Sequence, residues 1–384
     1  MKIFKAIDLF SGCGGLSCGL TQAGFKVVSA VEIDKNAAQT YSNYEPLQAT
    51  EVMISDIRKI KGKELKRISN ILEGEIYLLA GCPPCQNFSL QNPDNAMKTD
   101  EEKKELLFQF LRIIKEMYPP LILMENVPGI VTASNGKILK EFLDKLENKK
   151  CTHKDKRYYV VKDVLNAADY GVPQVRKRFV LQAIRYDLYS GLIEKGIDFH
   201  LPIATHSNTD IPGRKKWVTV GEAILDLPPI KQGETYLGAH NIKNHKCAGL
   251  SETNIKRIQS IRKGTGSRDS LPENLRLKCH KGYTGRSDVY GIMDLNKPAP
   301  TITGGCLCYS KGRFGHPTQD RAISIREAAR LQTFPDDFEF SDSLTKAGLQ
   351  IGNAVPVKLV KASGKIIHNI MEAYMSDRDD SVNG

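Results

Sequence analysis

The segment 81–89, with the sequence GCPPCQNFS, carries the side chain most suited to covalent chemistry in this 384-residue chain. The apolar run 76–80 precedes it, and Pro83 and Pro84 then fix φ at two successive positions. This arrangement presents Cys85 at the end of a buried strand, which is where open α/β sheets bind their ligands. We therefore predict that Cys85 is a nucleophile. A buried thiol without a chemical role is the plain alternative.

A zinc site is a second alternative for the same segment, because Cys82 and Cys85 could supply two of four ligands. The other two ligands would have to come from one of two later pairs, and neither pair has the CxxC spacing typical of structural zinc. Those pairs are Cys306 with Cys308 and His245 with Cys247. We predict that the chain has no metal site.

A carboxyl group follows the next apolar run along the chain. Glu125 comes directly after 121–124, and its neighbours 126–128 (Asn-Val-Pro) predict a rigid turn. Because the carboxyl ends of neighbouring parallel strands meet at one edge of a sheet, Glu125 and Cys85 are expected to face one pocket as acid and nucleophile. The alternative is a plain solvent-exposed carboxylate.

The segment 174–178, QVRKR, adds cationic groups. Alternation in a strand would place Gln174, Arg176 and Arg178 on one face. Three polar groups on one face either line a site or form a solvated sheet edge.

A glycine-rich turn near the start of the chain indicates a cofactor site. A strand-like run, 3–10, leads into Ser-Gly-Cys-Gly-Gly at 11–15 and then into a helix-like segment. Glu32 ends the next strand, about twenty residues beyond the first glycine, where nucleotide-binding folds place a ribose-binding acid. With Asp8 and Phe10 before the turn, the pattern suits S-adenosylmethionine better than a pyrophosphate, because a sulfonium amino acid needs acceptors and an aromatic face. A tight turn without a ligand is the alternative.

The elements that must position these groups alternate between strand and helix up to about residue 200, which predicts an open α/β sheet. We expect a first catalytic part at 1–200, a separate basic domain at 201–300, a return to the catalytic domain at 301–375 and a disordered tail at 376–384. The domain at 201–300 has 16 Lys and Arg against 9 Asp and Glu. Ser324 and Glu327 form a capping box that starts a helix within the returning part.

The whole chain has a net charge of +11, and its pI near 9.1 favours a polyanionic partner, with nucleic acid first. Nine scattered cysteines fit a reducing cytoplasm rather than a disulfide scaffold. No apolar run approaches the length that crosses a bilayer, and the start of the chain is too short and too charged for a signal peptide. We expect a soluble cytoplasmic protein without membrane partners.

The order of these motifs resembles that of the DNA (cytosine-5) methyltransferases of bacteria and phages. The resemblance spans nearly the whole chain except 201–300, where that family carries its variable target-recognition domain. The matching segments are 8–15, 81–89, 125–127, 174–178, 326–335 and 352–356. The resemblance implies a Rossmann-like, S-adenosylmethionine-dependent methyltransferase sheet with a smaller target-recognition domain.

The resemblance also implies roles for individual residues. Cys85 would attack carbon 6 of a flipped-out cytosine, and Glu125 would hold and protonate the ring. Arg178 would contact the base carbonyl and orient Glu125, with Arg176 close by. The residues expected around S-adenosylmethionine are Phe10, Ser11, Gly12, Gly14, Gly15, Leu16, Glu32, Ile33, Asp56, Ile57, Pro83, Leu106, Asn353 and Val355. The residues expected to contact DNA are Gln86, Ser89, Gln91, Thr301 and Ile302.

The implied activity is methyl transfer from S-adenosylmethionine to carbon 5 of cytosine in a specific double-stranded DNA sequence. The enzyme would act as a monomer, either as the partner of a separately acting restriction endonuclease or alone. One rival is a transfer-RNA cytosine-5 methyltransferase on the same scaffold, although the Cys-Phe-Thr tripeptide of that relative is absent here. A catalytically silent DNA-binding protein is the other rival.

Overall fold

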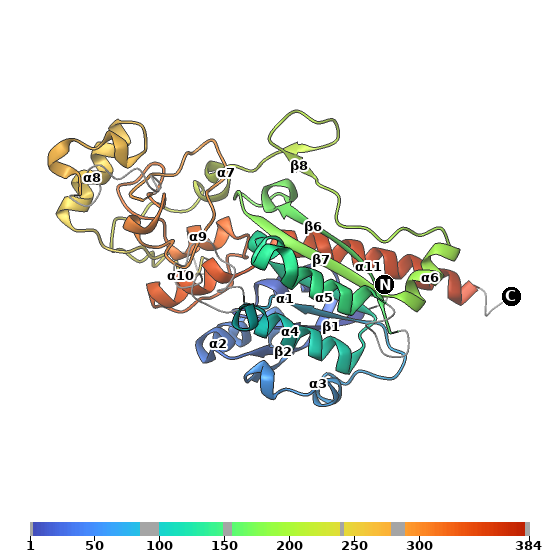
Figure 1. Cartoon of the computed structure of the whole chain (residues 1–384). Coiled ribbons are helices and arrows are strands. Elements are labelled where there is room, and N and C mark those ends of the chain that lie inside the picture. The colour runs from blue at the N-terminus through green and yellow to red at the C-terminus, as the bar shows by residue number, and fades with distance from the viewer. Residues whose placement is uncertain (1–2, 85–99, 149–155, 239–241, 278–288, 381–384) are drawn as a thin grey trace. The chain divides into compact units, whose positions relative to one another are not determined.

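The computed structural model describes residues 3–84, 100–148, 156–238, 242–277 and 289–380. The chain divides into two compact units. Unit 1 consists of Met1–Asn166, Lys177–Ile203 and Leu359–Gly384, and unit 2 consists of Ala167–Arg176 and Ala204–Lys358. Figure 1 shows the whole chain and labels many of its helices and strands.

Unit 1 is built on a seven-stranded sheet in the order β3-β2-β1-β4-β5-β7-β6. The strands β1 to β5 are parallel, β7 runs antiparallel to β5, and β6 runs antiparallel to β7. The strands are β1 Phe4–Leu9, β2 Phe25–Glu32, β3 Glu51–Ile54, β4 Tyr77–Gly81, β5 Leu121–Asn126, β6 Tyr158–Asn166 and β7 Lys177–Arg185. The predicted open α/β sheet is therefore confirmed.

Helices cover both faces of this sheet. In Figure 1, α4 and α5 lie in front of the sheet and α11 lies behind it. The front helices close a core of apolar side chains that includes Leu79, Phe110 and Ile113, all inaccessible to solvent. The helices of unit 1 are α1 Gly15–Gln22, α2 Lys35–Asn43, α3 Gly62–Ile68, α4 Asp100–Met117, α5 Lys137–Glu147, α6 Tyr186–Glu194 and α11 Val357–Asp380, whose first two residues belong to unit 2.

The strand order reverses between β1 and β4, because the chain runs outward from β1 to β3 and then returns to form β4 on the other side of β1. Leu9 and Gly81 are register partners at the carboxyl ends of these two strands, and the Cys82 N–H donates to the Leu9 carbonyl over 3.3 Å. A Cβ at Gly81 would lie 2.9 Å from the Phe110 ring, so only glycine fits there. The glycine turn and the segment leading to Cys85 thus leave the sheet side by side, at the switch point that binds ligands in this fold.

Unit 2 has little regular structure. Its helices are α7 Val220–Ile224, α8 Glu252–Lys263, α9 Ile325–Leu331 and α10 Leu344–Asn353, and the two-residue strands β8 His206–Ser207 and β9 Lys215–Lys216 pair in parallel. The predicted capping box of α9 is confirmed, with the Ser324 hydroxyl accepting from the Glu327 N–H and the Glu327 carboxylate accepting from the Ser324 N–H. By its contacts, 301–358 groups with unit 2, whereas the sequence assigned it to the catalytic domain.

Two sequence expectations need correction. The segment 174–178 is not one strand, because β7 begins at Lys177 and Gln174 forms an isolated bridge with Ala299. The expected disordered tail does not begin at Ser376, since α11 continues through Asp380. The backbone at 376–380 is therefore helical, and the rest of the expected tail lies outside the described residues.

Candidate active site

The turn after β1 is built around two glycines in the left-handed region. Gly12 and Gly14 have φ angles of 56° and 100°, which favour residues without a Cβ. A Cβ at Gly14 would lie 3.0 Å from the Tyr41 ring, whereas a Cβ at Gly12 would meet no described atom within 4 Å. Space is therefore available beside Gly12. The predicted cofactor residues Phe10, Ser11, Gly12, Gly14, Gly15 and Leu16 lie in this turn or at the start of α1.

Glu32 holds the turn in place. Its Oε2 accepts a hydrogen bond from the Gly12 N–H over 2.7 Å, and its Oε1 accepts from the N–H groups of Ile33 and Asp34 over 2.9 and 2.8 Å. Each carboxylate oxygen has two acceptor sites, so the group retains acceptor capacity. The Ile33 side chain next to it is 64% exposed. A carboxylate and an exposed apolar side chain thus lie beside the glycine turn.

Asp8 lies beneath the turn and is completely buried. The Tyr41 hydroxyl donates to Ser17 Oγ over 2.8 Å, and the Ser17 hydroxyl donates to Asp8 Oδ2 over 2.6 Å. Burial raises the pKa of Asp8 to about 7, against the opposing effect of the Ser17 hydrogen bond. Asp8 Oδ1 and the hydroxyl of Ser11 are buried without a hydrogen-bond partner among the described residues. Spacing in the sequence gave no signal for Ser17 or Tyr41.

The predicted adenine-side residues lie at the next turn of unit 1. Asp56 caps the short 3₁₀ helix Ile57–Lys59, and its carboxylate accepts from the Arg58 N–H over 2.9 Å. The Arg58 guanidinium pairs with the same carboxylate at 2.6 Å, and these hydrogen bonds lower the pKa of Asp56. Ile57 is buried, and Leu106 on α4 packs against the same core cluster. The Asp56 carboxylate therefore already has a protein partner.

Glu125 and Arg178 meet at the carboxyl end of β5. Glu125 is the register partner of Val180 on β7, and Arg178 lies two residues away on the same face. Arg178 Nε lies 2.8 Å from Glu125 Oε1, and the two side chains are 12% and 11% exposed. The ion pair is thus largely removed from water. It fixes the Glu125 carboxylate at the edge of the sheet from which the chain leads on from β4 to Cys85.

The segment that leads to the predicted nucleophile is anchored to this edge. Asn126, which follows Glu125, donates from Nδ2 to the carbonyl of the buried Pro83 over 3.4 Å. Pro83 is thereby held beside the end of β5, two residues before Cys85. Cys85 itself and the predicted DNA contacts Gln86, Ser89 and Gln91 lie outside the described residues, so their roles stay predictions.

The remaining predicted residues belong to unit 2. The Thr301 hydroxyl donates to the Val175 carbonyl over 2.9 Å, and Ile302 is completely buried. Asn353 ends α10 with an exposed side chain, whereas Val355 is buried. Of the two residues expected to contact DNA here, Thr301 has exposed atoms and Ile302 is buried. Of the two expected to contact the cofactor, Asn353 is exposed and Val355 is buried.

Arg176 differs from Arg178 in its surroundings. It belongs to unit 2, is 2% exposed, and donates to backbone carbonyls of Ile302 and Gly352 over 2.5 and 2.8 Å. Pairing of Gln174 with Ala299 keeps this segment out of β7, which explains why alternation over 174–178 was the wrong expectation. These contacts favour a positioning role for Arg176.

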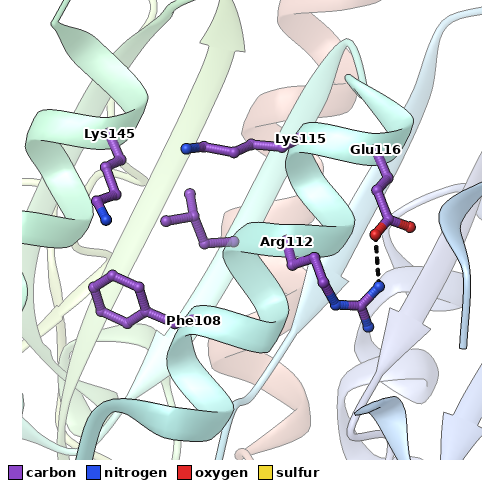
Figure 2. A pocket seen from close by; sticks show the side chains of 6 residues that line it. Phe108, Arg112, Lys115, Glu116 and Lys145 are labelled. Carbon is purple, nitrogen blue, oxygen red and sulfur yellow. Dashed lines mark hydrogen bonds and ion pairs between the residues drawn. The ribbon is translucent and has the colours of Figure 1, made fainter. Parts of the chain in front are cut away.

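A separate hollow lies on the helical surface of unit 1. It has a volume of about 370 Å³ and is lined by Phe108, Leu111, Arg112, Lys115, Glu116 and Lys145. Figure 2 shows Arg112 directed at Glu116, and their closest atoms are 2.7 Å apart. Lys145 pairs with Glu141 at 2.9 Å. Three of its four charged groups, Arg112, Glu116 and Lys145, are thus already paired. None of the predicted site residues lines it.

Within the described part of the chain, no group of three or more His, Cys, Asp or Glu side chains could hold a metal ion. No helix among those residues is long and apolar enough to span a bilayer.

The strand order, the glycine turn at the switch point and the acid at the end of β2 define a Rossmann-like α/β enzyme of the methyltransferase class. The chain belongs to the C-5 cytosine-specific DNA methylase family, whose model matches residues 4–369. The predictions of fold, family and enzyme class are thereby confirmed: the protein is a DNA (cytosine-5) methyltransferase of an S-adenosylmethionine-dependent family.

Curated relatives and a solved structure agree with this membership. The chain is 36% identical over 375 residues to the Type II methylase M.HgiDII of Herpetosiphon aurantiacus, covering 95% of each protein. It is 34% identical over 367 residues to the Type II methyltransferase M.NgoFVII of Neisseria gonorrhoeae, covering 94% of this chain and 86% of that protein. It resembles the crystal structure of a putative DNA modification methyltransferase of an E. coli prophage, with a TM-score of 0.63, 26% identity and coverage of 96% and 99%.

Proposed function

We propose that the enzyme methylates one cytosine within a specific double-stranded DNA sequence, through a covalent bond between Cys85 and carbon 6 of the flipped-out base. The observation that carries this proposal is the buried ion pair between Glu125 and Arg178 at the carboxyl end of β5. A base must leave the stack to reach such a recessed group, at a cost of a few kcal/mol.

The chemistry explains why each side chain is needed. Carbon 5 of cytosine is a weak nucleophile, and addition of the Cys85 thiolate to carbon 6, with protonation of the ring by Glu125, converts the ring into an enamine. Arg178 keeps the Glu125 carboxyl directed at the ring. S-adenosylmethionine supplies the methyl group that carbon 5 acquires. Loss of the proton from carbon 5 then expels Cys85 and restores the aromatic ring.

The residues around the glycine turn fit S-adenosylmethionine. Glu32 would accept a hydrogen bond from a ribose hydroxyl with the one remaining lone pair of Oε2, and Ile33 offers an exposed apolar surface to the adenine. Asp8 Oδ1 and the Ser11 hydroxyl are buried polar atoms without a described partner near the turn, as expected where a ligand completes the hydrogen bonding. Asp56 would have to accept the adenine amine alongside Arg58.

The recognition of DNA is assigned to unit 2 and to the segment that follows Cys85. Neutralisation of phosphates by basic residues of 201–300 would supply affinity, and Thr301 and Ile302 would lie near the flipped nucleotide. The Type II relatives support pairing with a restriction endonuclease that acts separately. Action as a monomer in the cytoplasm, where prokaryotic DNA is accessible, completes the proposal.

Bisulfite sequencing of DNA from cells that express the protein tests this proposal, because it reports the base and its sequence context together. We expect full methylation of one short sequence, and none in cells that express Cys85→Ala. Sequencing of transfer RNA from the same cells is the control. Modified transfer RNA beside unmodified DNA would refute the proposal in favour of the RNA-acting relative.

A further inference from the structure

Two segments of unit 2 that carry predicted ligand contacts meet at the Arg176 side chain. Its Nη1 donates to the Ile302 carbonyl over 2.5 Å, directly after Thr301. Its Nη2 donates to the Gly352 and Ala354 carbonyls over 2.8 and 3.3 Å. The guanidinium therefore holds the backbone on both sides of residue 353 and the backbone beside residue 301.

Two buried amides complete this arrangement. Gln174 Oε1 accepts from the Ile302 N–H over 2.8 Å, and Gln174 Nε2 donates to Gln332 Oε1 over 2.9 Å. Gln332 Nε2 donates to the carbonyls of Ile351 and Ala354 over 2.6 and 3.2 Å. We name Gln174, Arg176 and Gln332 the clasp. Each of its members is at most 2% exposed, so these hydrogen bonds form in the dry interior, where they are strong and specify one arrangement.

The two clasped segments are also in direct contact. A Cβ at Gly352 would lie 2.2 Å from Gly304 N and 2.2 Å from the Thr303 carbonyl carbon, so the backbones touch without an intervening side chain. A displacement of one segment must therefore move the other or break the clasp. A planar guanidinium with fixed donor directions transmits such a displacement better than a single ammonium group would.

We propose that Arg176 is a positioning residue that couples the Thr301–Ile302 segment, expected to contact DNA, to the Asn353–Val355 segment, expected to contact the cofactor. The inference rests on the proposed function, which supplies those two roles. A displacement of either segment by its ligand is passed to the other through the clasp, so cofactor and DNA strengthen each other's binding. By linkage, the factor is the same in both directions.

The test is a thermodynamic cycle with S-adenosylhomocysteine and a duplex that carries the methylated sequence identified by bisulfite sequencing. The dissociation constant of S-adenosylhomocysteine is measured by calorimetry with and without a saturating amount of the duplex, and the ratio of the two constants is the coupling factor. We expect a factor of about tenfold for the wild type, within the usual range of allosteric coupling. In Arg176→Lys, we expect a factor close to one.

Arg326→Lys is the matched control. Arg326 is also a buried arginine of unit 2, and it donates to the carbonyls of Lys243, Pro335 and Phe338 over 2.7, 2.7 and 2.5 Å. We expect Arg326→Lys to lower the melting temperature as much as Arg176→Lys does, and to leave the coupling factor at the wild-type value. A readout of stability alone cannot separate the two variants, but the coupling factor can.

An unchanged coupling factor in Arg176→Lys would overturn the inference, and so would an equal loss of coupling in both variants or a wild-type factor of one. If Arg176→Lys does not fold, Gln332→Met removes two donors of the clasp at nearly constant shape and must lower the factor as well. Failure of the wild type to bind S-adenosylhomocysteine or the duplex would instead refute the proposed function.

Discussion

Replacement of Asp8 by asparagine should change how the stability of unit 1 depends on pH. Asp8 has Ala30 and Ala80 as its register partners on the two neighbouring strands, and Ser17 is its hydrogen-bond donor. Burial raises its pKa, and the nearby charge of Glu32 adds to the rise. Asparagine keeps the shape and an acceptor for Ser17 but does not titrate.

The size of the effect follows from the pKa of Asp8, which is about 7 in the folded protein instead of its ordinary 3.8. Between these values the native state keeps a proton that the unfolded chain has released, so stability falls as pH rises from about 4 to about 7. Above that range both states are ionised, and no further stability is lost. The shift corresponds to about 4 kcal/mol in total, of which roughly 3 kcal/mol falls between pH 5 and pH 8.

Urea unfolding at pH 5 and pH 8, followed by circular dichroism, measures this effect. The difference between Asp8→Asn and the wild type cancels all other titrating groups, and it should change by roughly 3 kcal/mol in favour of the variant from pH 5 to pH 8. Emission of Trp217, the single tryptophan, reports on unit 2 and is the internal control. A difference that is the same at both pH values would refute the raised pKa.

Three further perturbations test the site and the fold. A duplex with 5-fluorocytosine at the target should form a denaturation-resistant adduct with the wild type, because carbon 5 then has no proton to lose and the enzyme cannot be released. Gel electrophoresis detects the adduct, and Cys85→Ser should form none. An adduct in the variant would show that another residue is the nucleophile. Arg178→Lys should lower kcat about tenfold to hundredfold with little effect on cofactor affinity, because lysine has no Nε–H to pair with Glu125 Oε1 and orient that carboxyl as proposed. A loss confined to cofactor binding in calorimetry would contradict that role. Glu327→Gln should destabilise unit 2 by about 3 to 5 kcal/mol in urea unfolding, because it leaves the charge of the buried Arg321 uncompensated; a loss below about 1 kcal/mol would contradict it.

The sheet could be predicted because its strands are locally encoded. The apolar runs at 3–10, 76–80 and 121–124 all became strands, since each is buried on both faces and bounded by glycine, proline or polar residues. The capping box at Ser324 was equally readable, because its two partners lie three residues apart. Such features need only neighbours along the chain.

The chemistry at the strand ends was partly readable for the same reason. Glu32 ends β2, and its position beside the glycine turn could be anticipated from the spacing between them. The surroundings of Asp56 were less readable. Its partner Arg58 lies only two positions further on, but Arg58 is also held by Glu105 on α4, 47 positions away. Strand position indicates where a carboxylate lies but not which cation reaches it.

The QVRKR segment shows where local reasoning fails. Its two arginines are two residues apart, so a single strand would place both on one face of the sheet. The structure nevertheless gives them different partners. Arg178 stays in β7 and pairs with Glu125 from the adjacent strand, 53 positions earlier in the sequence. Arg176 instead contacts carbonyls 126 and 176 residues away. The arginine proposed to serve the reacting base and the arginine proposed to position two backbone segments therefore have the same sequence signature, and only variants that separate catalysis from coupling can distinguish them.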